Sequence, residues 1–249
     1  MPRPRRRRLG CWLFLAVAAL ALLFGWRELQ RMMREHPERF PWTELSLNDP
    51  VGPFTGMKIA GLGDDPRRCL ELLRDARLAE TVYVQPVPDD PRCRFTDGVT
   101  VRPEDRGSIR FLPASLVTSC PVAAALALWE RDVVQPAART RFGSRVVQID
   151  HAGSYSCRRM YGQAEGRFSE HATADAIDVL GFRLADGRRI SVLGDWPDSS
   201  GEAAFLRDAR DGACELFSTV LSPDYNQAHA DHFHLDQAAR GAAGWHLCR

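Results

Sequence analysis

The stretches SEHATADAID (residues 169–178) and HADHFHLD (residues 229–236) alternate polar with apolar side chains. Because successive side chains of a β-strand point to opposite faces, the alternation predicts strands at 176–182 and 232–236. One face of these strands would be apolar and would pack on a core. The other would carry imidazole and carboxylate groups. We expect on the apolar face Ile177, Val179, Phe233 and Leu235, and on the polar face Asp178, His232, His234 and Asp236.

A bound metal ion would explain so many polar groups on one face, because burying such groups without partners costs a few kcal/mol each. The sharpest hypothesis is a zinc site with His171, Asp178 and His234 as ligands. Two imidazoles, one carboxylate and an open fourth position are typical of catalytic zinc. The alternative is a solvated histidine-rich loop that binds nothing. Non-haem iron is disfavoured because only His246 remains to supply a distant third ligand to the His229–Asp231 pair.

The elements around these strands predict an α+β fold: a small, mainly antiparallel sheet flanked by helices. Apolar residues recur at helical spacing over residues 121–138 and 202–220. A further strand is expected at 146–149. The Ala185-Asp186-Gly187 turn predicts that 176–182 pairs in a hairpin with 189–193.

Residues 27–54 are expected to be a linker, because prolines punctuate it after a short polar continuation of the N-terminal helix. Residues 55–110 are expected to form a small N-terminal subdomain or cap, and residues 111–249 the main domain. Within 55–110, Asp65-Pro66 predicts the start of a helix, and TVYVQ (81–85) predicts a short strand.

The N-terminus carries a membrane signal. Residues 9–26 form an uncharged apolar run, long enough at about 1.5 Å per residue to approach the ~30 Å hydrocarbon core. The arginine-rich residues 1–8 should stay cytoplasmic and send the rest across the membrane. We expect an uncleaved signal anchor in a bacterial inner membrane, with the C-terminal domain in the periplasm. The alternative is secretion after signal cleavage.

Charge argues against nucleic acid as a partner. Of the 33 Lys and Arg residues, five arginines precede residue 9, which leaves 28 basic residues against 32 acidic ones in the rest of the chain. A slightly acidic body lacks the broad basic surface that binding DNA or RNA requires.

Six cysteines lie outside the apolar run, an even number that indicates disulfides in an exported chain. Fifteen pairings of six cysteines exist. Proximity along the chain favours Cys69–Cys93, Cys120–Cys157 and Cys214–Cys248, and buried free thiols are the alternative. No C-x-x-C pair occurs, so a cysteine zinc ribbon has no support.

The spacing S-x-H-x(6)-D followed by a distal H-x-H resembles the zinc metallopeptidase superfamily of D-Ala-D-Ala carboxypeptidases and dipeptidases, murein endopeptidases and the Hedgehog signalling domain. The matching residues are Ser169, His171, Asp178, His232 and His234. Over residues ~60–249, segments such as YSCR, SEHATADAIDV and HADHFHLD make the chain most similar to the bacterial extensin-like C-terminal domain family. Ala174 stands where the superfamily usually has glycine. If that position needs a positive φ, alanine would strain the loop by about 1 kcal/mol or more.

The resemblance implies a role for each matching residue. His171, Asp178 and His234 would bind Zn²⁺, and His232 would organise the site or stabilise the transition state. A general base should lie a few residues before His234, where both His229 and Asp231 qualify. Arg158 would pair with a substrate carboxylate or the developing oxyanion.

The resemblance also implies the function: a zinc-dependent peptidase that cuts peptidoglycan peptides, as an endopeptidase or a D,D-carboxypeptidase. The alternative is a non-catalytic, metal-stabilised module that binds cell wall or a partner protein. The oligomeric state is left open.

Overall fold

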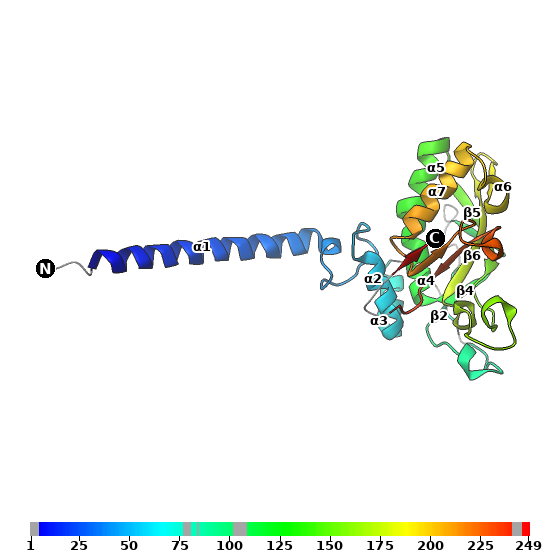
Figure 1. Cartoon of the computed structure of the whole chain (residues 1–249), viewed down its shortest axis with the longest axis horizontal. Helices are drawn as coiled ribbons and strands as arrows, with labels where there is room; N and C mark the ends of the chain where they lie inside the picture. The colour runs from blue at the N-terminus through cyan, green and yellow to red at the C-terminus, as the bar shows by residue number, and fades with distance from the viewer. Residues whose placement is uncertain (1–4, 77–80, 84, 102–108, 241–245) are drawn as a thin grey trace. The chain divides into compact units, whose positions relative to one another are not determined.

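The computed structural model describes residues 5–76, 81–83, 85–101, 109–240 and 246–249, in two units, residues 1–44 and 45–249 (Figure 1). The first unit contains α1 (Arg5–Glu35) and a 3-10 turn, η1 (Pro37–Arg39). Among the described residues, α1 alone is long and apolar enough to cross a membrane, a property that anchors and signal sequences share. Residues 1–4 of the predicted cytoplasmic segment lie outside the described residues.

The second unit contains both helices and strands. Its helices and helical turns are α2 (Thr55–Ala60), η2 (Gly61–Asp64), α3 (Pro66–Asp75), η3 (Pro91–Cys93), α4 (Cys120–Trp129), η4 (Glu130–Val134), α5 (Gln135–Phe142), η5 (Met160–Gly162), η6 (Glu170–Thr173), α6 (Val192–Asp195), α7 (Gly201–Ala213) and η7 (Gln227–His229). Its strands are β1 (Thr81–Val82), β2 (Gly98–Val101), β3 (Arg110–Leu112), β4 (Leu116–Ser119), β5 (Val146–Gly153), β6 (Ala176–Leu184), β7 (Arg189–Ser191), β8 (Thr219–Leu221), β9 (Phe233–Asp236) and β10 (Leu247–Cys248).

The strands form two sheets. β1, β2 and β4 make a three-stranded antiparallel sheet. The larger sheet has the order β10-β8-β9-β6-β5-β3, with β7 also paired to β6. Its central pairs are antiparallel, and its outer pairs β3–β5 and β8–β10 are parallel. The prediction of a mainly antiparallel sheet flanked by helices is confirmed, and Figure 1 shows α4, α5 and α7 gathered on one side of the strands.

The alternation predicted for β6 and β9 is confirmed. The two strands pair antiparallel, with Ile177 opposite Leu235 and Asp178 opposite His234. The predicted apolar side chains are fully buried. They belong to a core that α4 and α7 complete, in which Phe182 contacts the rings of Trp129 and Phe205. This packing holds the opposite face of β6 and β9 in place.

The helix predicted at 121–138 is present but passes through a π-helical turn, η4, between α4 and α5. Pro136 explains the turn, because it lacks an N–H and its ring crowds the carbonyl of residue 132. The Gln135 N–H bonds instead to the carbonyl of Glu130, five residues back. The π-helical turn lets the helix continue past the proline to Phe142.

The helix predicted at 202–220 is too long: α7 ends at Ala213, and residues 219–221 form β8. Leu216 and Phe217 lie beyond the end of the helix but are still buried. Their apolar side chains therefore extend the helical pattern in the sequence past the last helical residue. Short apolar runs do not distinguish strand from helix by periodicity alone. The strand predicted at 81–85 is confirmed over Thr81–Val82, and Val84 lies outside the described residues.

The helix predicted at Asp65-Pro66 is confirmed: α3 begins at Pro66, and the Asp65 side chain accepts a hydrogen bond from the Arg68 N–H. The inward face of α3 joins the same hydrophobic core as α4. Whether residues 55–110 act as a cap stays a prediction.

The prediction that the six cysteines form disulfides is confirmed, but only one of the three predicted pairs is correct. Cys214–Cys248 is present, whereas the other bonds are Cys69–Cys120 and Cys93–Cys157. The predicted pairs Cys69–Cys93 and Cys120–Cys157 are wrong because contacts between elements, rather than separation along the chain, decide the partners. α3 packs on α4. η3 contacts η6, and the Ser156 N–H bonds the His171 carbonyl of η6, so Cys157 lies near Cys93. Within the described residues, Cys11 of α1 is the one free cysteine.

Candidate metal centre

His171 is positioned by a short turn that precedes β6. The Ser169 hydroxyl caps η6 by accepting the His171 N–H, and the turn ends at Ala174. Ala174 has φ 57° and ψ 20°, the left-handed conformation that would explain why glycine is usual at this position. The backbone is held there by its neighbours, because the Ala174 carbonyl accepts bonds from the Ser119 N–H and the Thr118 hydroxyl. Local strain of about 1–2 kcal/mol is therefore tolerated beside the candidate site.

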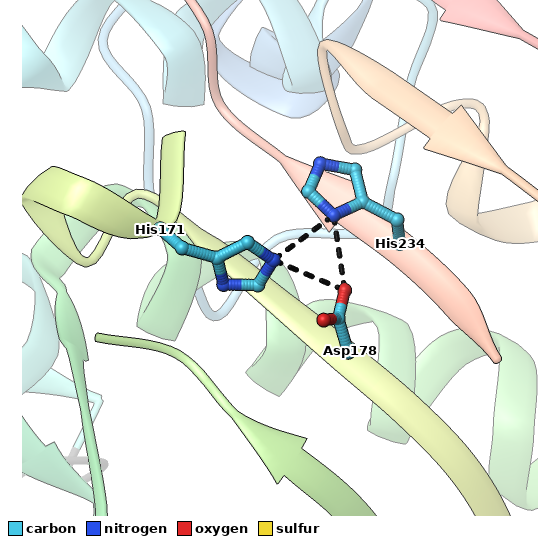
Figure 2. A group of neighbouring side chains, drawn as sticks. All are labelled: His171, Asp178 and His234. Atoms are coloured by element: carbon cyan, nitrogen blue, oxygen red, sulfur yellow. Dashed lines mark hydrogen bonds and ion pairs between the residues drawn. The ribbon is translucent and has the colours of Figure 1, made fainter. Parts of the chain in front are cut away.

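Three side chains meet on the polar face of the sheet (Figure 2). The His171 Nε2 atom lies 3.1 Å from Asp178 Oδ1 and 3.2 Å from His234 Nδ1. His234 Nδ1 lies 3.0 Å from the same Asp178 oxygen. The side chains are only 4%, 13% and 12% exposed, in chain order. The predicted ligand set therefore converges on one point, and the described residues contain no other cluster of this kind.

The outer ring nitrogens of both histidines have acceptors. His171 Nδ1 lies 2.8 Å from the Ser154 carbonyl, and His234 Nε2 lies 3.1 Å from a carboxylate oxygen of Asp236. Each outer nitrogen donates its hydrogen there, so each inner nitrogen can direct a lone pair at the cluster. Outer partners of this type orient the histidines of metal sites.

Three lone-pair atoms this close repel one another unless a cation lies between them. Burial raises the pKa of Asp178, but hydrogen bonds from His171 and His234 outweigh it and hold that pKa well below its usual value. Burial lowers the pKa of His234, and its bonds to Asp178 and Asp236 reverse this and raise it to about 9. A proton on His234 Nδ1 makes a hydrogen bond to Asp178 Oδ1. The lone pair of His171 Nε2 still faces the same carboxylate oxygen.

A metal ion would satisfy all three atoms together. Tetrahedral zinc with bonds of about 2.0–2.2 Å needs ligand atoms about 3.4 Å apart, and the three atoms lie 3.0–3.2 Å apart. The donor set of two imidazoles and one carboxylate is one that zinc accepts with a fourth position open. The residues present therefore fit such an ion with a shift of a few tenths of an ångström.

The cluster lies in a cleft of about 700 Å³. Strand side chains form its floor, and two loops form its walls: residues 154–169, here called the cleft lobe, and the segment around η7. Its residues, besides the three candidate ligands, include Arg158, Tyr161, Arg167, Phe168, Glu170, Tyr225, His229, His232, Asp236 and Arg240.

The structure separates the two residues considered as general base. His229 lines the cleft, and its Nδ1 lies 2.7 Å from the Asn226 side-chain oxygen, which leaves Nε2 as an acceptor. Burial, together with the charges of His232 and His234, lowers the pKa of His229 to about 4, so the ring is neutral at pH 7. The Asp231 carboxylate is more than half exposed and lies 2.7 Å from His232 Nδ1.

The other two predicted residues also line the cleft. His232, oriented by Asp231, places its Nε2 3.5 Å from Asp178 Oδ1. Arg158 lies on the cleft lobe, and its guanidinium forms no ion pair with any residue that the structure describes. Asp236, predicted on the polar face, has both oxygens engaged: one bonds His234 and the other accepts the Ala238 N–H.

Some contacts in and near the cleft were not foreseen from the sequence. The Ser154 carbonyl that orients His171 belongs to the backbone and leaves no signal in the side chain. Arg240 reaches the cleft only because β8 lies between β9 and β10. Trp196 is buried against Phe233, on the apolar side of β9.

Comparison with known families covers most of the second unit. Residues 67–249 match the family described as "Extensin-like protein C-terminus". The chain belongs to this family. No curated protein and no solved structure matches the chain.

Proposed function

We propose that residues 45–249 form a zinc-dependent peptidase domain that hydrolyses peptide bonds of peptidoglycan. The observation that carries the proposal is the convergence of His171, Asp178 and His234, whose three lone-pair atoms face one another at the floor of an open cleft. A buried structural metal would need no cleft of about 700 Å³ beside it. The size is that of a pocket for a small ligand or a short peptide segment.

A zinc ion bound there supplies Lewis acidity that polarises a substrate carbonyl and lowers the pKa of water. Proton transfer falls to His229, whose neutral ring can accept a proton from the attacking water and pass it to the leaving amine. His232, held by Asp231 at Nδ1, has its Nε2 beside Asp178, where the protonated ring would donate a hydrogen bond to negative charge that develops there. Arg158 binds a carboxylate or the oxyanion with its two-pronged guanidinium.

The proposed substrate and location rest on the N-terminal helix and on the disulfides. The apolar helix α1, preceded by arginines, supports anchorage in the inner membrane with the domain in the periplasm. The three disulfides favour an oxidising compartment. Peptidoglycan is the peptide-containing polymer that such a domain would meet, and the resemblance to murein peptidases supports the same substrate.

Digestion of purified muropeptides by the full-length, zinc-loaded chain in detergent tests this proposal. We expect cleavage products with the wild type and a 10²–10⁴-fold lower kcat (roughly, for loss of a general base) with His229→Gln, at unchanged zinc content. His36→Gln is the matched control, because His36 lies in the first unit and leaves the cleft intact. A zinc-loaded wild type that binds muropeptides without cutting them would instead support the non-catalytic binding module.

A further inference from the structure

One end of the cleft holds a single fixed cation that the proposed mechanism does not use. This end is formed by β8, β10 and the residues that follow β9, and its side chains are small or apolar apart from one arginine. They are Thr219, Leu221, Ala238, Ala239, Arg240 and Leu247.

The guanidinium of Arg240 is tied to β8 rather than free in solvent. Its Nε donates to the Ser218 carbonyl and to the Thr219 hydroxyl, both at 3.1 Å, and a terminal nitrogen also donates to the Thr219 hydroxyl. These bonds occupy one edge of the guanidinium. The remaining N–H groups are left to bind a ligand, and a planar guanidinium suits a carboxylate.

No carboxylate of the described residues forms an ion pair with Arg240. Asp236 lies directly across from Thr219 in the sheet, but both its oxygens are engaged, by His234 and by the Ala238 N–H. The Glu170 carboxylate, which also lines the cleft, is near enough for its charge to interact with Arg240 without forming an ion pair. An arginine that is held in place, forms no ion pair and faces a cleft can still bind an anionic group of a ligand.

The sheet register gives the distance from Arg240 to the metal centre. Thr219 lies on the neighbouring strand and two residues along from the level of His234. With strands about 4.8 Å apart and a rise of about 3.4 Å per residue, the two backbones lie roughly 8 Å apart. An extended peptide covers about 3.5 Å per residue. The Arg240 side chain is therefore within one to three residues of a bond cut at the metal centre.

We propose that Arg240 is a specificity-determining residue that binds a carboxylate of the substrate peptide, one to three residues from the scissile bond. The inference rests on the proposed peptidase function. It concerns a different region from Arg158, which belongs to the cleft lobe after β5, whereas Arg240 follows β9 and lies over β8. Two arginines on separate walls would select a peptide with acidic groups on both sides of the cut.

Kinetics of the full-length, zinc-loaded chain test the assignment with two probes: a peptidoglycan stem pentapeptide with free carboxylates and the same peptide with all carboxyl groups amidated. We compare wild type, Arg240→Gln and the control Arg189→Gln, an exposed arginine on β7 that does not line the cleft. Removing one charge-assisted contact should raise KM for the free peptide about tenfold or more in Arg240→Gln, with kcat unchanged. The amidated peptide should react equally with all three proteins.

Binding provides a second readout that does not depend on turnover. Calorimetric titration in the His229→Gln background should show the same loss of affinity for the free peptide when Arg240→Gln is added. Zinc content and unfolding temperature should stay at wild-type values. Equal affinity of the wild type for free and amidated peptides would overturn the role of Arg240 and leave the peptidase proposal standing. Failure of the wild type to bind or cut either peptide would overturn the peptidase proposal and this inference with it.

Discussion

Asp175 shows how one side chain near the metal centre affects stability. Its carboxyl accepts a hydrogen bond of 2.7 Å from the Ser119 hydroxyl, which also caps α4. Burial, and to a smaller extent the negative charges of Asp236 and Asp97, raises the pKa of Asp175 to about 8, although the bond from Ser119 acts the other way. The folded protein therefore holds a proton here that the unfolded chain releases near pH 4.

We predict that Asp175 makes the free energy of unfolding fall as the pH rises from about 4 to about 8. The folded pKa lies above the unfolded one, so stability is complete below pH 4 and is lost through pH 8, by at most about 1.4 kcal/mol per pH unit. Asp175→Asn keeps an acceptor for Ser119 and removes the titration. Urea unfolding at several pH values should show a shallower slope for the variant. Parallel curves for the two proteins would refute the prediction.

The three candidate ligands could be predicted at the residue scale, because the alternation of β6 and β9 and the motif spacing identify them without a structure. The resemblance raised the question of a positive φ at Ala174, a position where glycine is usual, and the structure has it. Two groups near the ligands could not be foreseen. Arg240 and the Ser154 carbonyl reach the site through strand order and backbone geometry, which a single sequence does not encode locally.

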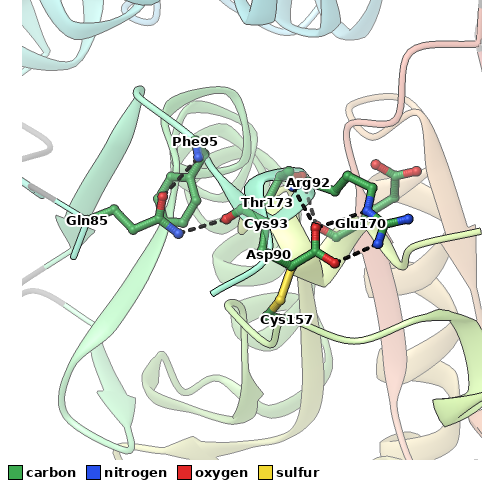
Figure 3. Close-up of a disulfide and its surroundings, with 8 residues drawn as sticks. All are labelled: Gln85, Asp90, Arg92, Cys93, Phe95, Cys157, Glu170 and Thr173. Atoms are coloured by element: carbon green, nitrogen blue, oxygen red, sulfur yellow. Dashed lines mark hydrogen bonds and ion pairs between the residues drawn. A yellow bond between two sulfur atoms is a disulfide. The ribbon is translucent and has the colours of Figure 1, made fainter. Parts of the chain in front are cut away.

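At the scale of elements, the Cys93–Cys157 disulfide fixes the cleft lobe (Figure 3). The Gln85 side chain holds the Cys93 segment from the other side, by donating to the Cys93 carbonyl and accepting the Phe95 N–H. Within the lobe, the Phe168 ring lies between the guanidiniums of Arg92 and Arg159, at 4.5 and 4.6 Å. Arg158 is the residue next to the disulfide, so the bond positions the side chain proposed to bind substrate.

We predict different effects from removing two disulfides. The Cys93→Ser/Cys157→Ser variant should speed hydrogen exchange of the Met160 and Ser169 amides, whose bonds to Arg167 and Arg158 close the lobe. It should raise KM for stem peptides about tenfold and keep its zinc. The Cys214→Ser/Cys248→Ser variant should lose roughly 2–5 kcal/mol of stability without faster exchange of these two amides. Equal exchange in the two variants would show that the disulfide does not position the lobe.

Elements were easier to predict than their ends or their partners. The alternating and helical spacings predicted β6, β9 and the long helix of α4 and α5, because burial imposes those periods directly. The capping signal at Asp65-Pro66 predicted the start of α3. The end of α7 was missed because Leu216 and Phe217 stay buried beyond it. Two of the three predicted disulfides were wrong, because their pairing is set by packing of α3 on α4 and of η3 on η6.

At the scale of the whole molecule, the chain combines an apolar N-terminal helix with a disulfide-bonded α+β unit of the extensin-like family. The unit of residues 45–249 contains the entire described core, all three disulfides and the candidate metal centre. Every further proposal, from proton transfer at His229 to carboxylate binding at Arg240, depends on a metal ion bound by His171, Asp178 and His234.

Zinc content of the purified unit, residues 45–249 folded in an oxidising compartment, tests that claim most directly. We predict about one zinc per chain in the wild type and in His229→Gln, whose side chain lines the cleft without being a ligand. The double variant His171→Ala/His234→Ala should contain none and still unfold cooperatively. A folded wild type without zinc, or a double variant that retains it, would contradict the account.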